Sequence, residues 1–273
     1  MMILAEHHKK ILRSIQVNIP FRMLVESYLD IFTANQINPE IGIDAYALEN
    51  FTRSDFEKIA GAFSAYQARI TLHGPFIDLS AGSKDPRIRD VTRRRLRQIL
   101  TLIPIFEPLT IVCHAGYDAK RYAFFKEEWL RNSLDMWSWF ARELNALGVR
   151  LMLENVYEKD PQDMLVLLEG LERENVGLCL DIGHLSSFGD STPQIWLGSL
   201  GNVIGQFHLH DNDRTFDQHL GLGAGAIDFE PVWRHINARK QHPPVITLEP
   251  HEKEDLLTSL AYLESYADIL SNR

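Results

Sequence analysis

The chain is poor in cysteine. Only Cys113 and Cys179 occur among its 273 residues, and each lies inside a run that we expect to form a strand. Two isolated cysteines can build neither a disulfide framework nor a Cys-x-x-Cys metal site. We therefore expect both thiols to be reduced, as in a cytoplasmic protein.

An excess of basic charge and long apolar runs are also lacking. The formal net charge is −9, which argues against binding of nucleic acid through overall charge, although local contacts stay possible. No stretch approaches the roughly 20 apolar residues of a membrane span. The N-terminal MMILAEHHKK places His and Lys where a signal peptide needs an apolar run. We expect a soluble protein without membrane contact.

A glycine-rich phosphate loop is missing after the first expected strand, where the sequence reads NIPFRM, and no linker or internal repeat interrupts the chain. Short β-rich runs alternate instead with helical patterns. The expected strands lie at about 15–19, 40–44, 69–73, 109–114, 149–154, 176–181, 204–209 and 245–249. The expected helices lie near 22–34, 54–66, 86–106, 124–147, 161–173, 192–200, 229–239 and 252–270. Eight such units predict a single-domain α/β fold, a (β/α)₈ TIM barrel over residues 1–273 with residues 1–14 as an N-terminal extension.

Six of the expected strands finish on or next to a side chain that can hold a metal ion. These side chains are His73, His114, Glu154, Asp181, His208 and Glu249. In a (β/α)₈ barrel the carboxyl ends of all strands form one rim, where the active site lies. A polar strand end often only caps the next helix, but six of them together predict a reaction centre.

Three local patterns add to this site. In Asp181-Ile-Gly-His184 a carboxylate and an imidazole share one loop. His208 and His210 lie on one face of a strand because side chains alternate, so their spacing does not decide which of them is the ligand. Finally, Asp217-Gln-His219 precedes the flexible run GLGAG at 221–225.

These segments resemble the xylose isomerase-like TIM barrels, a superfamily that includes the endonuclease IV type of AP endonuclease family 2. The resemblance covers residues 69 to 249 through LHGPFIDLS, VCHAGYD, LENVYE, LDIGH, FHLHDND, DQH and LEP. In the endonuclease IV branch three zinc ions are held by five histidines, two aspartates and two glutamates. The matching positions here are His73, His114, Glu154, Asp181, His184, His208, Asp217, His219 and Glu249. The resemblance thus selects His208 over His210.

The sugar epimerase branch of the same superfamily needs only one ion. The resemblance assigns that ion to Glu154, Asp181, His208 and Glu249. It also implies a substrate-binding arginine at Arg214. We expect His184 and Phe76 to lie beside the substrate as well.

The sequence departs from the endonuclease IV pattern in one turn. That branch carries a glutamate in a Gly-Glu-Gly turn, whereas this chain reads Gly223-Ala224-Gly225. Phe76 and Ile77 could wedge into DNA, but we expect them to roof a small-ligand pocket or to pack inward. The arginine stripe of Arg89, Arg93 and Arg97 is interpreted as a solvated helix face, and His7, His8, His235 and His242 as surface residues.

Two mechanisms fit these ligands. Imidazole and carboxylate ligands without thiolate suit zinc or manganese, in one to three ions. One ion could stabilise an enediolate of a sugar or sugar phosphate while Glu154 and Glu249 transfer protons, as in an isomerase or epimerase. Several zinc ions would instead generate hydroxide for phosphoester hydrolysis. We favour the isomerase or epimerase with a small carbohydrate substrate over a nucleic acid, and a non-catalytic metal-binding barrel last. The sequence does not indicate an oligomeric state.

Overall fold

The computed structural model describes residues 3–271 of the chain. Its eight strands are β1 Gln16–Pro20, β2 Asn38–Gly42, β3 Thr71–His73, β4 Thr110–His114, β5 Arg150–Glu154, β6 Gly177–Asp181, β7 Ile204–Leu209 and β8 Val245–Leu248. They pair in chain order and close into a barrel, and parallel pairing of β1 with β8 seals the ring. The predicted single (β/α)₈ barrel is confirmed.

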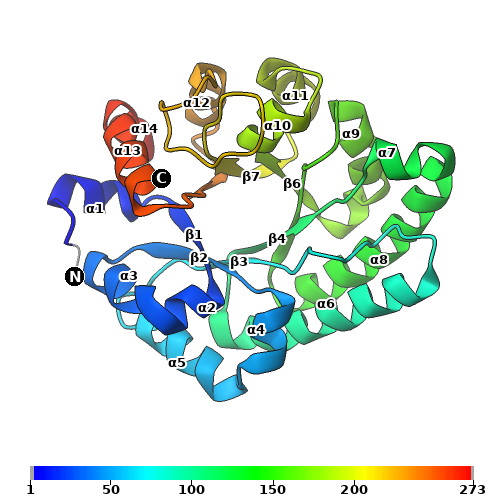
Figure 1. The fold of residues 1–273 in the computed structure, drawn as a ribbon, viewed down its shortest axis with the longest axis horizontal. Coiled ribbons are helices and arrows are strands. Elements are labelled where there is room, and N and C mark those ends of the chain that lie inside the picture. Colours follow the sequence, from blue (N-terminus) through cyan, green and yellow to red (C-terminus); the bar gives the residue numbers. More distant parts are fainter. Residues whose placement is uncertain (1–2, 272–273) are drawn as a thin grey trace.

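Helices surround the strands, as Figure 1 shows. Their bounds are α1 Glu6–Leu12, α2 Phe21–Met23, α3 Leu29–Asn35, α4 Ala45–Asn50, α5 Arg53–Ser64, α6 Pro86–Phe106, α7 Ala119–Tyr122, α8 Lys126–Ala146, α9 Pro161–Gly170, α10 Ile182–Phe188, α11 Pro193–Leu200, α12 Glu230–Ala238, α13 Lys253–Leu263 and α14 Ala267–Ser271. Helix α1, in the predicted N-terminal extension, contacts α13 and α14 at the other end of the chain. None of the described helices is both long and apolar enough to cross a lipid bilayer.

The predicted start of helix α5 was wrong by one residue, and so was its cap. We expected a capping box of Ser54 with Glu57, but Thr52 is the N-cap and Asp55 closes the box through the Thr52 backbone N–H at 2.8 Å. The same four-residue pattern fits Thr52 and Asp55, and the cap must lie just before the first helical residue, Arg53.

The apolar core has two parts. The large part fills the space between strands and helices, and a small cluster of Val112, Met152 and Cys179 lies apart from it. These three residues belong to β4, β5 and β6, at the alternate positions that face the barrel axis. Two positions further along the same strands are His114, Glu154 and Asp181. The strand period therefore points these side chains toward the axis.

Polar side chains fill the rest of the barrel interior. Glu40 on β2 is fully buried and accepts hydrogen bonds from Thr71 (2.8 Å), Gln206 (2.5 Å) and Thr247 (3.2 Å). Thr110 donates to the Gln206 side-chain oxygen at 2.7 Å. These bonds join β2, β3, β4, β7 and β8, so the interior below the mouth is a hydrogen-bonded network.

Two of the four histidines predicted at the surface are partly buried. His7 and His242 are exposed, whereas the His8 ring is within 2.9 Å of Glu264 and the His235 ring packs on Phe207 at 6.0 Å. The reason is the packing of α1 against α13 and of α12 against β7, which residue type alone does not reveal.

Candidate metal centre

All nine side chains predicted as ligands meet at the carboxyl end of the barrel. Each has a nitrogen or oxygen within 3.8 Å of another member of the set. Four of them end a strand, namely His73, His114, Glu154 and Asp181. His208 is the penultimate residue of β7, and Glu249 follows the last residue of β8. His184 lies in the first turn of α10, and Asp217 and His219 lie in the loop between β7 and α12.

Glu154 is shared between two groups of imidazoles. Its Oε2 atom lies 3.0 Å from His73 Nε2 and 3.4 Å from His114 Nε2. Its Oε1 atom lies 3.2 Å from His184 Nδ1 and 3.4 Å from His208 Nδ1. The carboxylate is 1% exposed. We call His73, His114 and Glu154 the first group.

His208 is the centre of the second group, which consists of Glu154, Asp181, His208 and Glu249. The His208 Nδ1 atom lies 3.0 Å from Glu249 Oε1, 3.4 Å from Glu154 Oε1 and 3.8 Å from Asp181 Oδ2. Three carboxylates therefore face one imidazole nitrogen.

Asp217 joins the third group, which consists of His184, Asp217 and His219. Its Oδ2 atom lies 3.3 Å from His184 Nε2 and 3.1 Å from His219 Nε2. Both residues of the Asp217-Gln-His219 step thus take part in a group completed by an imidazole from another loop.

Four of the imidazoles are tethered through one ring nitrogen. His73 and His184 donate through Nδ1 to the carbonyls of Gly74 (2.9 Å) and Asn155 (3.1 Å). His219 Nδ1 donates to the Glu249 carbonyl at 3.0 Å. His208 Nε2 is 2.9 Å from Glu40 Oε1. Such tethers are typical of metal-binding histidines, because they leave the second nitrogen free as a ligand.

The residues present fit divalent metal. Tetrahedral zinc with bonds of about 2.1 Å places neighbouring ligand atoms about 3.4 Å apart, and the separations above are 3.0 to 3.8 Å. Asp181 Oδ2, His208 Nδ1 and Asp217 Oδ1 are buried and have no hydrogen-bond partner within residues 3–271. Buried polar atoms without a partner are costly. A cation among them would remove that cost.

The electrostatics of the site suit a cation as well. Burial lowers the pKa of His114 to about 3 and so keeps this imidazole neutral. Burial opposes the charge of His219, but its hydrogen bond to Asp217 and the charge of Glu249 raise its pKa to about 9. Against the effect of burial, His208 holds the pKa of Glu249 well below its usual range. Glu249 thus stays ionised and attracts positive charge.

Phe76 and Arg214 were both predicted beside the substrate, but only Phe76 contacts a predicted ligand. The Phe76 ring stacks on the His114 ring at a centroid distance of 4.2 Å, and 44% of Phe76 is exposed. Phe76 therefore forms an apolar wall over the first group. Arg214 is exposed and donates to the Ala226 carbonyl at 2.7 Å, which holds its guanidinium along its own loop.

Sequence reasoning did not single out Glu40 and Glu158, and it set His210 aside. Glu40 lies 2.9 Å from His208 Nε2 and orients that ring, and its signal was a glutamate at the start of an expected strand. Glu158 accepts the backbone N–H groups of Tyr117 (2.8 Å) and Val156 (2.7 Å), and so joins two loops of the rim. The sequence carries no periodic signal for this contact.

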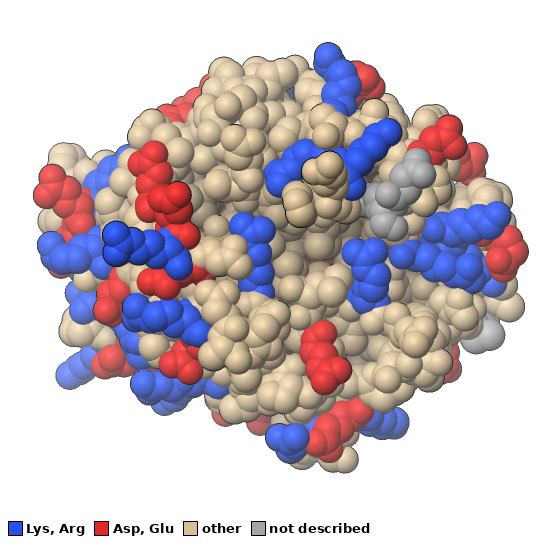
Figure 2. Space-filling view, turned by 180° about the vertical axis from the view of Figure 1, so that it is seen from behind, with Lys and Arg blue, Asp and Glu red and all other residues tan. Residues whose placement is uncertain are grey.

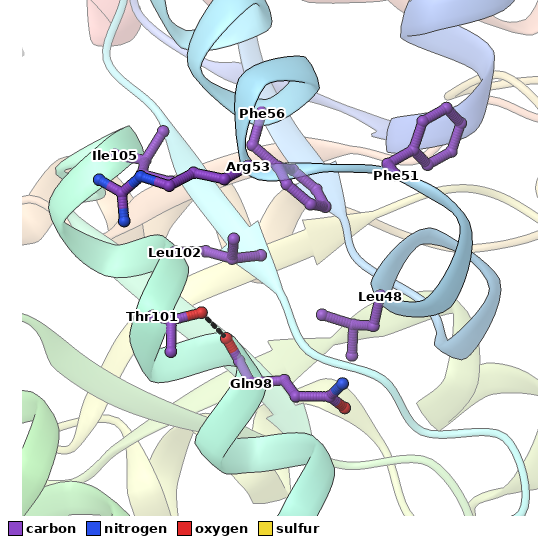
Figure 3. Close-up of a pocket in the computed structure, with 8 residues that line it drawn as sticks. All are labelled: Leu48, Phe51, Arg53, Phe56, Gln98, Thr101, Leu102 and Ile105. Atoms are coloured by element: carbon purple, nitrogen blue, oxygen red, sulfur yellow. Dashed lines mark hydrogen bonds between the residues drawn. The ribbon is translucent and has the colours of Figure 1, made fainter.

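A groove on the outside of the barrel is separate from the three ligand groups. Figure 3 shows it between α4, α5 and α6, lined by Leu48, Phe51, Arg53, Phe56, Gln98, Thr101, Leu102 and Ile105. Its lining contains no imidazole and no carboxylate. The reactive groups therefore gather at the barrel mouth.

Fold and site together define a class: a (β/α)₈ barrel whose strand ends bring imidazoles and carboxylates together. Residues 30–266 match the sequence model of the family described as xylose isomerase-like TIM barrel. The chain belongs to this family.

Three solved structures are similar over most of their length. The TTHB071 protein from Thermus thermophilus, soaked with ZnCl₂, is 28% identical with a TM-score of 0.79, covering 93% of this chain and 98% of that chain. A D-tagatose 3-epimerase-like protein is 24% identical with a TM-score of 0.77, covering 93% and 97%. A D-psicose 3-epimerase from Clostridium cellulolyticum H10, solved with D-tagatose, is 15% identical with a TM-score of 0.75, covering 93% and 98%.

Proposed function

We propose that this protein is a divalent-metal-dependent isomerase or epimerase of a sugar or sugar phosphate. The observation that carries the proposal is the second group, in which the buried carboxylates of Glu154 and Asp181 and the partly buried one of Glu249 converge on His208 Nδ1 within 3.8 Å. The names of the two epimerase structures above support a carbohydrate substrate.

A bound zinc or manganese ion would hold substrate oxygens and stabilise the negative charge left when a proton leaves the adjacent carbon. Glu154 and Glu249 are the proton acceptor and donor in this proposal, because β5 and β8 are three strands apart in the ring and can flank a substrate. His184 would bind substrate hydroxyl groups, and so would Arg214 once its guanidinium leaves the Ala226 carbonyl. Phe76 would exclude water from one side.

A second candidate function is phosphoester hydrolysis by a cluster of up to three zinc ions. The specific observation that favours it is Glu154, whose two oxygens face different imidazole groups as a bridging carboxylate does. The third group adds a complete set of ligands. The net charge of −9 favours a small substrate over a nucleic acid.

Counting metal on protein purified without chelator separates the two candidates. One tightly bound ion per chain supports proton transfer, and two or three support hydrolysis. The same preparation is then incubated with ketoses and their phosphates in D₂O, and with abasic-site DNA. Epimerisation with deuterium incorporated at the epimerised carbon supports the proposal. Strand cleavage without sugar turnover overturns it.

Substitution of single ligands gives an independent test. An isomerase that uses the second group should tolerate His114→Ala far better than Asp181→Ala, since His114 belongs only to the first group. Turnover of the active ketose and metal content are measured for both variants. Equal loss in both would point to a cluster and against the single-ion mechanism.

A further inference from the structure

His210 is the most unusual side chain at the barrel mouth that has no role in the proposed function. It is 1% exposed, and neither of its ring nitrogens has a hydrogen-bond partner among the described residues. Burying two such atoms without partners is unfavourable. The position therefore calls for a compensating interaction.

Each nitrogen of His210 faces a carboxylate of a different ligand group. Nε2 lies 3.2 Å from Asp181 Oδ1 of the second group, and Nδ1 lies 3.7 Å from Asp217 Oδ1 of the third. The Asp181 Oδ1 atom also accepts the His184 backbone N–H at 2.6 Å. Asp181 Oδ1 therefore contacts both the His210 ring and the His184 backbone N–H. Asp181 Oδ2 remains available to the second group.

The fold reserves a slot for this ring. On one side is Gly183, where an added Cβ would lie 1.9 Å from His210 Cε1. On the other side the His219 ring stacks on it at 3.8 Å with an interplanar angle of 5°. The Asn212 side chain holds the slot in place by donating to the Gly183 carbonyl at 2.9 Å.

The stacking of the His210 and His219 rings decides whether His210 is a metal ligand beside His219 or a residue that orients other ligands. A ring nitrogen binds metal in the plane of its ring, and two parallel rings 3.8 Å apart cannot both have one ion in their planes. His210 in this position is therefore not a ligand beside His219. Its contacts are with carboxylates of the ligand groups and with the face of a ligand ring.

We propose that His210 is a positioning residue that orients Asp181 and His219 and thereby supports metal binding by the second and third groups. The inference rests on the proposed metal centre, but not on the reaction. Of its two polar contacts, the one from Nε2 to Asp181 is the shorter and is expected to dominate. Loss of such supporting contacts weakens metal affinity by roughly ten- to a hundredfold.

The test uses two substitutions that each retain one nitrogen position of the imidazole. His210→Gln keeps an amide near the Nε2 position, and His210→Asn keeps one near Nδ1. The affinity of each metal-free protein for Zn²⁺ is measured by competition with a chromophoric chelator, and the Co²⁺ absorption spectrum reports ligand geometry. We expect His210→Asn to lose roughly ten- to a hundredfold in affinity and to change the Co²⁺ spectrum. His210→Gln should keep a Zn²⁺ affinity and a Co²⁺ spectrum close to those of the wild type.

His251 provides the matched control. Its ring stacks on the His219 ring at 3.9 Å, but it is exposed and no contact with Asp181 is found among the described residues. His251→Asn should leave Zn²⁺ affinity within about twofold of the wild type. Thermal melts of the metal-free variants show whether they are folded.

The outcomes separate this inference from the proposed function. Equal Zn²⁺ affinities of wild type, His210→Asn and His210→Gln would overturn the role of His210, and so would equal loss in both variants. Absence of Zn²⁺ binding by the wild type would overturn the metal centre itself. Zn²⁺ binding without turnover of any ketose would contradict only the isomerase function.

Discussion

At the scale of single residues, four of the five imidazoles in the three groups have one tethered nitrogen and one that faces a carboxylate. The tethers come from backbone carbonyls of rim loops and from Glu40 inside the barrel. A tether removes rotational freedom from the ring before any ion binds. Preorganised ligands of this kind bind metal without the cost of ordering side chains.

Glu249 offers a direct test of proton transfer at this scale. Glu249→Gln keeps the side-chain shape but removes the carboxylate that lies 3.0 Å from His208 Nδ1. We expect turnover to fall at least about a hundredfold, the scale of lost acid–base or metal function, with an unchanged circular dichroism spectrum. The exposed Glu57→Gln is the control. Turnover close to that of the wild type would remove Glu249 from the mechanism.

Glu158 makes stability depend on pH. Burial raises its pKa from 4.5 to about 7, although two backbone N–H groups favour its ionised form. A folded-state pKa above the unfolded value means that stability is complete below pH 4.5 and declines as the pH rises through 7. The decline attributable to this residue is up to about 3 kcal/mol.

Urea unfolding at pH 5, 6, 7 and 8 of wild type and Glu158→Gln isolates this effect. The amide does not titrate, so the stability of the variant relative to the wild type should rise with pH. Parallel pH profiles of the two proteins would show that Glu158 has an ordinary pKa.

At the scale of elements, one buried carboxylate holds the loop that carries the third group. Asp211 Oδ2 accepts the N–H groups of Gly223 and Gly225 at 3.0 Å each, and Oδ1 accepts that of Ile227 at 3.1 Å. The Asp211 backbone pairs with Leu220 at 2.8 Å in both directions. The GLGAG run and the Asp217–His219 segment are thus tied to the end of β7.

The glycine at position 225 is required by this arrangement. A Cβ there would lie 2.4 Å from the Asn212 carbonyl and from Asp211 Oδ1. Glycine lets the backbone approach the carboxylate closely enough to donate its N–H. The sequence suggested a flexible loop, whereas the structure shows one with several hydrogen bonds.

Asp211→Asn should loosen this loop. The amide replaces one accepting oxygen by a donor, leaving partly buried N–H groups unpaired at a cost of up to about 1–3 kcal/mol. Amide hydrogen exchange of residues 221–227 should become faster, and Zn²⁺ bound by the third group should be released more easily. Asp213→Asn, an exposed change two residues away, is the control. Unchanged exchange would contradict the anchoring role.

At the scale of the whole molecule, metal binding and folding stability are linked. An ion present at a thousandfold its dissociation constant stabilises the native state by about 4 kcal/mol. For a chain of this size that is roughly 10 °C in Tm. Adding a chelator should lower Tm by this amount and leave the barrel folded, because the apolar core lies outside the strand ring. Identical melts with chelator and with Zn²⁺ would argue against a bound ion.

The surface charge also belongs to this scale. On the face drawn in Figure 2, basic and acidic side chains are interspersed. Two arginines of the stripe on α6 have protein partners: Arg93 pairs with Asp135 at 2.8 Å, and Arg89 donates to carbonyls of the preceding loop. The interpretation of the stripe as a solvated helix face therefore holds for the exposed Arg97, whereas Arg89 and Arg93 are partly buried by these contacts.

The sequence alone determined the barrel and the edge at which its reactive groups would meet. Period-two strands alternating with period-3.6 helices leave few closed arrangements, and parallel strands end at one rim. Strand ends were less accurate: β2 covers residues 38–42 where 40–44 was predicted, since pairing with β1 begins at Gln16 and Asn38.

Only the tertiary structure decided how the nine predicted ligands divide into groups and which residues support them. The two oxygens of Glu154 serve different neighbours, Glu40 on β2 contacts His208 on β7, and His210 fills a slot made by Gly183 and His219. Such contacts depend on the angles at which loops leave the barrel. Local residue patterns do not predict those angles, because long-range packing sets them.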